Sequence, residues 1–116
     1  MAHTNASDPA PRLPFLAPQS SRPGVALFEA DFASRGEGII PFKGGRFTVE
    51  PGSTSRPDTH QVRECWMVAA GEGLLTYDGG QFRIRAGDYL YFEPMKTHQV
   101  HNDGRDTLVI HTVWWG

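Results

Sequence analysis

The sequence lacks several features that would place it in a common class of protein. Its single cysteine, Cys65, cannot form an internal disulfide. No apolar stretch is long enough to cross a bilayer, and the first residues lack the basic-then-apolar order of a secretion signal. The formal net charge of −2 comes from interspersed acidic and basic residues, which gives no electrostatic surface for nucleic acid or an anionic membrane. These absences predict a cytoplasmic protein with no nucleic-acid or membrane partner.

Long helical patterns are also missing, so we expect little helix. From Gly45 onward, short apolar or β-branched runs alternate with glycine turns, as is typical of strands. The sequence Asp78-Gly79-Gly80 predicts a tight hairpin, because primed turns require positive φ angles. Several short strands at this spacing predict an all-β sandwich or barrel. The predicted strands are 46–50, 65–68, 74–77, 81–85, 88–92, 98–100 and 107–115.

The first 24 residues differ in composition from the rest and hold five of the nine prolines. Because proline removes amide donors, residues 1–24 are predicted to form an extended arm outside the sheet, and residues 25–116 one β-barrel domain. We expect Leu13, Phe15 and Leu16 to dock on the barrel or on a partner subunit, since an arm that buries nothing would rarely be ordered.

Polar side chains form two clusters that a barrel could bring onto one interior wall. Asp58, His60 and Glu64 lie in the first cluster, and His98 and Asn102 in the second. Strand-like segments separate the clusters. This arrangement predicts a single metal site.

The two clusters resemble the two motifs of the cupin superfamily. The first motif runs from Gly52 through Asp58, His60 and Glu64 to Gly71; the second runs from Gly87-Asp88 through the turn at Pro94 to His98 and Asn102. Asp58 stands where the family usually has its first histidine, and Met95 stands where the second motif usually has glycine. The resemblance implies a small single-domain cupin with a jelly-roll β-barrel. It also implies a homodimer.

The resemblance implies one divalent metal ion, with His60, Glu64 and His98 as ligands. Two imidazoles and a carboxylate with open positions suit Fe(II), and Mn, Zn, Ni and Co are also compatible. Asp58 has three alternatives: a fourth ligand, which we favour, an unligated general base, or a side chain turned to solvent. The catalytic candidates are therefore Asp58, His60 and His98.

Further residues are candidates for the substrate pocket, although core packing or exposure is the alternative for each. Trp66, Phe92 and Trp114 could line an aromatic pocket. Asn102 could orient a ligand or satisfy strand polarity. Arg46 and His111 depend on strand parity, which the sequence alone does not fix.

Three classes of function remain open. The first is a metal-dependent enzyme with a small, oxygen-rich substrate and either dioxygenase or isomerase/lyase chemistry. The second is a metal-free isomerase or dehydratase that uses histidine acid-base catalysis, and the third is a non-catalytic small-molecule-binding barrel.

Overall fold

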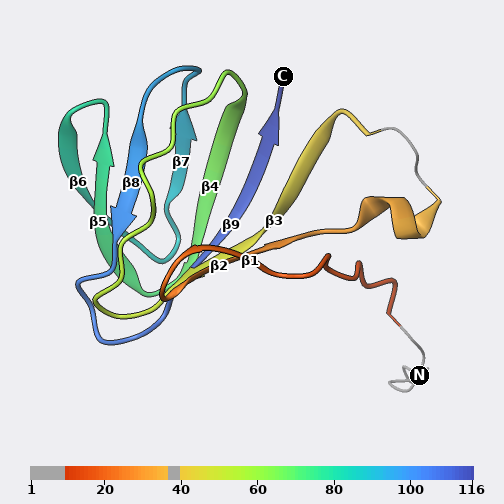
Figure 1. Ribbon diagram of the computed structural model, residues 1–116, viewed down its shortest axis with the longest axis horizontal. Helices are drawn as coiled ribbons and strands as arrows, with labels where there is room; N and C mark the ends of the chain where they lie inside the picture. The colour runs from red at the N-terminus through yellow and green to blue at the C-terminus, as the bar shows by residue number, and fades with distance from the viewer. Residues whose placement is uncertain (1–9, 37–39) are drawn as a thin grey trace, which may run out of the picture.

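The computed structural model describes residues 10–36 and 40–116, which form two antiparallel sheets facing each other (Figure 1). The larger sheet has the strand order β1-β2-β3-β9-β4-β7, and the smaller sheet has the order β6-β5-β8. The architecture is the predicted all-β jelly roll. The strands are β1 (Gln19–Arg22), β2 (Val25–Glu29), β3 (Phe42–Val49), β4 (Arg63–Ala70), β5 (Glu72–Tyr77), β6 (Gly80–Arg85), β7 (Tyr89–Phe92), β8 (His98–His101) and β9 (Leu108–Trp115).

Alternation along the strands places the core between the two sheets. In β9, Leu108, Ile110 and Thr112 are buried, and the residues between them are more exposed. Because antiparallel pairing keeps paired residues on the same face, β9 aligns its inward residues with those of β3 and β4. The register pairs Thr112 with Trp66, and this pairing places both side chains beside the site described below.

The hairpin between β5 and β6 forms where the sequence predicts it. Asp78 and Gly79 both have positive φ angles, 48° and 84°, as a type I′ turn requires. Ile84 is buried as expected from the alternation in β6, but Phe82 on the same face is 53% exposed. The buried part of this face therefore begins at Ile84, because Phe82 lies close to the turn.

The prediction that residues 1–24 lie outside the sheet is wrong for β1. Gln19 pairs with Leu27 of β2, so β1 is the edge strand of the larger sheet. Before it, Phe15 packs edge-on against Phe28, with ring centroids 6.1 Å apart, and lies under the guanidinium of Arg46. Docking of Phe15 on the barrel is thus confirmed. Residues 1–9 of the predicted arm lie outside the described residues.

Helix is scarce in the described residues, as predicted. The helical element η1 (Phe32–Arg35) is a single 3-10 turn, capped by the Asp31 side chain, which accepts from the Ser34 amide. No described helix is long and apolar enough to span a bilayer.

Candidate metal centre

The segment between β3 and β4 carries the first polar cluster to the second. The Asp58 amide donates to the His98 carbonyl at 2.9 Å, and the His98 amide donates to the Asp58 carbonyl at 3.0 Å. This isolated antiparallel bridge places the segment beside β8. The His60 carbonyl also accepts from the Met95 amide at 2.8 Å, so both motifs are joined by backbone hydrogen bonds.

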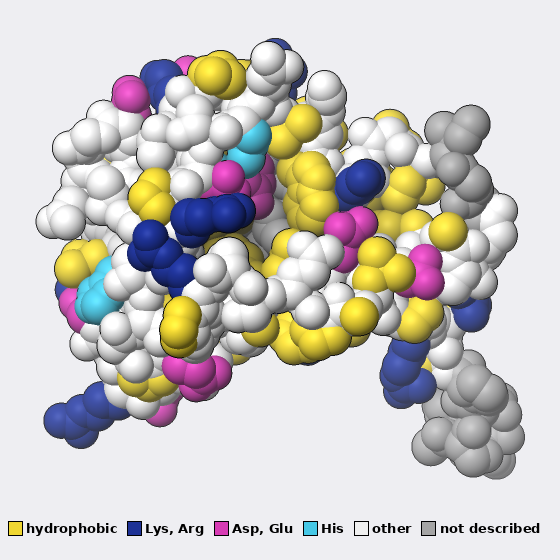
Figure 2. All heavy atoms as spheres, in the orientation of Figure 1, with side chains coloured by type: hydrophobic (Ala, Val, Ile, Leu, Met, Phe, Trp, Pro, Cys, Tyr) yellow, Lys and Arg dark blue, Asp and Glu magenta, His cyan; other side chains and the backbone are white. Residues whose placement is uncertain are grey.

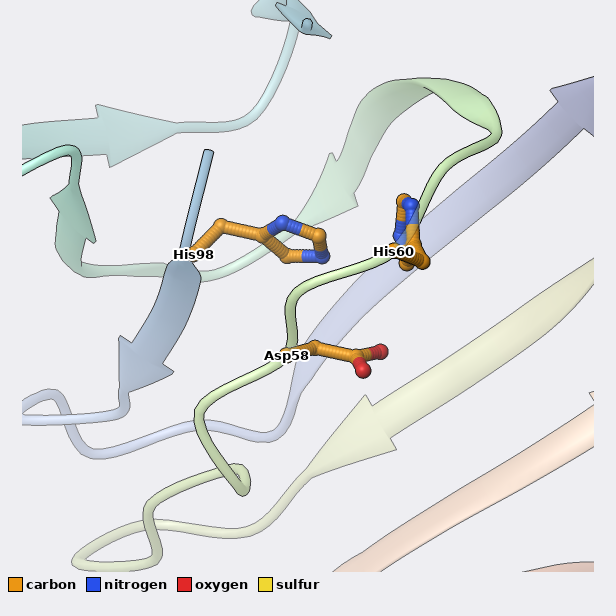
Figure 3. Close-up of side chains that lie close together, drawn as sticks. All are labelled: Asp58, His60 and His98. Carbon is orange, nitrogen blue, oxygen red and sulfur yellow. The ribbon is translucent and has the colours of Figure 1, made fainter. Parts of the chain in front are cut away.

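Three of the predicted metal ligands present donor atoms to one place (Figure 3). Asp58, His60 and His98 each offer one ligand atom, and these atoms lie within 4.8 Å of one another. His98 enters from the start of β8, whereas Asp58 and His60 come from the segment that leads to β4 (Figure 3). The structure therefore brings together side chains that are 40 residues apart in the sequence.

Glu64, the fourth predicted ligand, lies between the two imidazoles. Its Oε1 is 3.0 Å from Nε2 of His60 and 3.2 Å from Nε2 of His98. Its Oε2 accepts hydrogen bonds from Nε1 of Trp66, at 3.0 Å, and from the Thr112 hydroxyl. One carboxylate oxygen is thus held by two neutral donors, while the other faces the histidines.

These contacts change the acidity of Glu64. Burial alone would raise the pKa of its carboxyl, but hydrogen bonds from His98, Thr112 and Trp66 outweigh burial and lower the pKa to about 2. The side chain is therefore ionised across the physiological range, which is the state required of a metal ligand.

The His60 ring is oriented by a backbone acceptor. Its Nδ1 lies 2.9 Å from the Val62 carbonyl, so Nδ1 carries a proton and Nε2 of the neutral ring carries a lone pair. That lone pair faces an oxygen of the ionised Glu64, and two such atoms 3.0 Å apart require a positive charge between or beside them. Either a proton on His60 or a metal ion supplies that charge, so the donor set fits a bound cation.

The protonation equilibrium of His60 reflects the same arrangement. Burial lowers the pKa of its imidazole. The hydrogen bond with Glu64, the bond to the Val62 carbonyl and the nearby acidic charges together raise the pKa by more than burial lowers it, so the net shift is upward. The acidic surroundings of His60 therefore stabilise a positive charge at this site, whether a proton or a metal ion carries it.

His98 is held by aromatic packing. Its ring stacks on Phe92, with centroids 4.4 Å apart and planes at 11°, and meets the edge of Trp66 at 5.4 Å. Its Nδ1 is buried and has no hydrogen-bond partner within residues 10–36 and 40–116. The unpartnered Nδ1 favours the tautomer in which Nε2 carries the proton and donates to Glu64. As a metal ligand, His98 would use Nε2 without that proton, and Nδ1 would carry the proton instead.

Asp58 is the least constrained member of the group. Its backbone is fixed by the bridge to His98, but its side chain is exposed and makes no hydrogen bond to another described residue. A carboxylate in this position is free to turn toward the two imidazoles. The geometry is thus compatible with Asp58 either as a ligand or as an unligated base.

The donor atoms lie on the wall of a cavity of about 320 Å³. In Figure 2 a recess near the middle of the visible face has histidine and acidic side chains on one side and hydrophobic side chains on the other. We call His60, Glu64, His98 and Thr112 the donor wall, and Val25, Leu27, Phe47 and Trp114 the apolar wall. The remaining lining residues are Gln19, Ser21, Ser55, Arg56, Asp58, Val62 and Trp66.

Comparison with known proteins gives the family. The family model described as a cupin domain matches residues 45–114, which is more than half of the chain. This chain belongs to the cupin family. Both predicted motifs lie within the matched residues.

Solved cupin-like structures agree with this assignment. A Cupin 2 conserved barrel domain protein from Salinispora arenicola is 34% identical over 66% of this chain and 65% of its own length, just under two thirds, with a TM-score of 0.63. A structure described in connection with the mechanism of oxalate oxidase is 25% identical over 83% of this chain and 53% of its own, with a TM-score of 0.71. A "predicted oxalate decarboxylase" from Thermotoga maritima, 21% identical over 89% of this chain and 92% of its own, shares the fold with a TM-score of 0.69.

Two of the predicted pocket residues, Trp66 and Trp114, line the cupin cavity, but four others do not. Phe92 lies behind His98 as its stacking partner. Asn102 is fully buried, and it donates to the carbonyls of Val49 and Asp106 and accepts from the Gly104 amide, which uses its polar atoms in the structure itself. Asn102 therefore satisfies buried backbone polarity, the second of its two predicted roles.

Arg46 and His111 point to the opposite face of the larger sheet. The two are paired across β3 and β9 and are exposed, and the Arg46 guanidinium lies 5.1 Å from the centroid of the Phe15 ring. Placing them in the pocket is wrong, because Phe47 and Thr112, their neighbours in sequence, occupy the inward positions.

Sequence reasoning missed Thr112, Phe47 and Arg56 as site residues. Thr112 follows Ile110 at a spacing of two in a strand whose buried positions are otherwise apolar, and this break in the pattern is the signal that could have found it. Phe47 and Arg56 carry no comparable signal in the sequence.

Proposed function

We propose that this cupin is a metal-dependent enzyme in which His60, Glu64 and His98, together with Asp58, hold one divalent ion beside a small-molecule cavity. The observation that carries the proposal is the position of Glu64 Oε1, at 3.0 and 3.2 Å from the two imidazole Nε2 atoms. Ligand atoms at right angles around an ion at about 2.1 Å are about 3 Å apart, so little movement is needed to accept Fe, Mn, Zn, Ni or Co.

The chain's own residues supply the orientation. Trp66 and Thr112 fix one carboxylate oxygen of Glu64, and the Val62 carbonyl fixes the tautomer of His60, as the residues around bound metals commonly do. A bound ion would polarise substrate oxygens or, if it is iron, support redox chemistry with dioxygen. Asp58, at the mouth, would complete the ligand set or accept a substrate proton on its carboxylate.

The chemistry is either dioxygenation or an isomerase/lyase reaction of a small molecule whose oxygens chelate the ion. Some similar structures carry oxalate oxidase or oxalate decarboxylase names, and this supports a reaction at oxygen-bearing carbon without naming the substrate.

Metal analysis of protein purified without chelator, followed by oxygen-electrode measurements during turnover, tests the proposal. Bound iron together with oxygen uptake would select a dioxygenase, and zinc or manganese without uptake would select an isomerase or lyase. Protein that stays metal-free when offered Fe, Mn, Ni and Zn would refute the metal-dependent function.

One observation favours a second candidate, a metal-free isomerase or dehydratase. His60 and Glu64 form a hydrogen-bonded pair. Burial lowers the pKa of the His60 imidazole, but the contacts with Glu64 and the Val62 carbonyl outweigh it and raise the pKa above its ordinary value, so His60 holds a proton more firmly than a free imidazole and can deliver it into the cavity. In that case His60→Gln would abolish activity that chelator treatment of the wild type leaves intact.

A further inference from the structure

The cavity has more apolar surface than a metal site needs. Phe47 and Trp114 of the apolar wall come from β3 and β9, and Leu27 comes from β2. They share the recess with the donor wall (Figure 2). A ligand without an apolar part would leave this surface in contact with water, whereas a ligand with an apolar body the size of a ring would cover it.

Arg56 is the lining residue that carries a permanent positive charge. It lies at the cavity mouth, is exposed, and forms no ion pair with another residue of the described chain. Asp58, two residues further on, lines the same cavity. A guanidinium without a carboxylate partner at the edge of a pocket can bind a carboxylate or a similar oxyanion through two parallel hydrogen bonds.

The balance of charge depends on the metal. With both imidazoles neutral, one guanidinium (Arg56) against two carboxylates (Asp58 and Glu64) gives the lining a formal charge of −1, and two positive charges from a divalent ion would change it to +1. An anionic ligand is therefore favoured in the metal-loaded cavity and disfavoured in the empty one.

We propose that the ligand of this cavity is an organic monoanion with a ring-sized apolar body, of the aryl-substituted carboxylate class. Arg56 and the metal ion hold the anionic group, and the apolar wall covers the body. This inference rests on the proposed metal-dependent function, and it makes a monoanion without an apolar body a weaker ligand because such a molecule leaves the apolar wall uncovered.

Calorimetric titration of the zinc-loaded protein with three probes tests the inference. Phenylacetate has both the single negative charge and the apolar body, 2-phenylethanol has only the body, and acetate has only the charge. We expect phenylacetate to bind at least about tenfold more tightly than either of the others, since a charge-assisted contact and burial of a ring each contribute that much.

Two arginine variants separate the role of Arg56 from a general effect of charge. Arg56→Gln should weaken phenylacetate binding about tenfold and leave both zinc content and 2-phenylethanol binding unchanged. Arg22→Gln is the matched control, because Arg22 donates to the Ser55 carbonyl close by but does not line the cavity, and its phenylacetate affinity should equal that of the wild type.

The outcomes distinguish this inference from the proposed function. If zinc binds but phenylacetate binds no better than 2-phenylethanol or acetate, or if Arg56→Gln changes nothing, the ligand class is wrong and the metal site stands. If separate titrations show that none of Zn, Fe, Mn and Ni binds, the proposed function fails, and the ligand class that depends on it fails as well.

Discussion

The donor wall and the apolar wall of the cavity are held in place by different means. In the donor wall, Glu64 has a hydrogen-bonding contact at each of its two oxygens, and the ring of His60 is fixed by a backbone carbonyl. The apolar wall rests on van der Waals packing, and β2, which supplies two of its members, is flanked by the exposed edge strand β1. Metal affinity and selectivity for an apolar ligand body are therefore expected to depend on different side chains and to be separately changeable.

The largest effect is expected from Glu64→Gln. The amide keeps the size of the side chain but removes the charge that faces both imidazoles, so metal affinity should fall by at least about 100-fold in calorimetric titration with Zn or Mn, at the upper end of losses seen for weaker disturbances of metal sites. Glu93→Gln is the control, because Glu93 is an exposed carboxylate paired with Lys96 at 3.1 Å, outside the cavity. Equal losses of metal affinity in Glu64→Gln and Glu93→Gln would show that the donor wall has no special role in binding the metal.

The pH dependence of unfolding tests the same wall without metal. The pKa of Glu64 falls from an ordinary 4.5 to about 2 on folding, so its ionisation stabilises the folded state by an amount on the order of 3 kcal/mol. This contribution to the free energy of unfolding is present above pH 4.5 and is lost as the pH falls toward 2. The pKa of His60 is raised instead, so its contribution is present below pH 6.5 and is lost as the pH rises through the higher folded value.

Metal-free protein should thus be most stable between about pH 4.5 and 6.5, measured by urea unfolding across the pH range. Glu64→Gln should flatten the acid side of this profile. An acid limb of unchanged size in the variant would show that other carboxylates cause it.

A smaller effect is expected from Asp58→Asn, because the side chain of Asp58 is exposed and lacks hydrogen-bond partners in the described structure. If it is a ligand, metal affinity should fall about tenfold, measured by competition with a chelator. If it is only a base, affinity should survive while turnover collapses. Asp58→His restores the histidine usual at this position of the family and should retain metal in either case. Unchanged metal affinity and activity in Asp58→Asn would show that Asp58 has no role in the site.

The smallest effect on the metal is expected from a change in the apolar wall. Leu27→Ala removes apolar contact from a half-buried position and should lower the free energy of unfolding by about 1 to 2 kcal/mol. Its metal affinity should equal that of the wild type, because Leu27 contacts the cavity and not the donor atoms. A parallel loss of metal affinity would mean that the two walls are coupled.

The fold from Gly45 onward was predictable because short apolar or β-branched runs alternate there with glycine turns. All seven predicted strands are present, with ends that differ by a few residues. β1 was not predicted, because the sequence Gln19-Ser-Ser-Arg22 contains no apolar residue and therefore no alternating pattern. Its place in the sheet comes from pairing with β2. Tertiary pairing overrides local composition in such a segment.

The donor residues were predictable for a different reason from the pocket residues. His60, Glu64 and His98 belong to motifs with fixed spacing, so their convergence could be expected from the family resemblance. The direction in which the side chains of Arg46 and His111 point could not be predicted, because β3 and β9 carry apolar residues on both faces. Only the pairing of the two strands in the sheet sets which face is inward.

X-ray absorption at the zinc edge of zinc-loaded protein tests the central claim most directly, since it reports the atoms around the ion. The account predicts one zinc per chain, with the multiple-scattering signal of two imidazoles and the remaining ligands oxygen, all at about 2.0 to 2.2 Å. A spectrum with oxygen ligands alone, or an imidazole signal that persists unchanged in His60→Gln, would contradict the site formed by His60, Glu64 and His98.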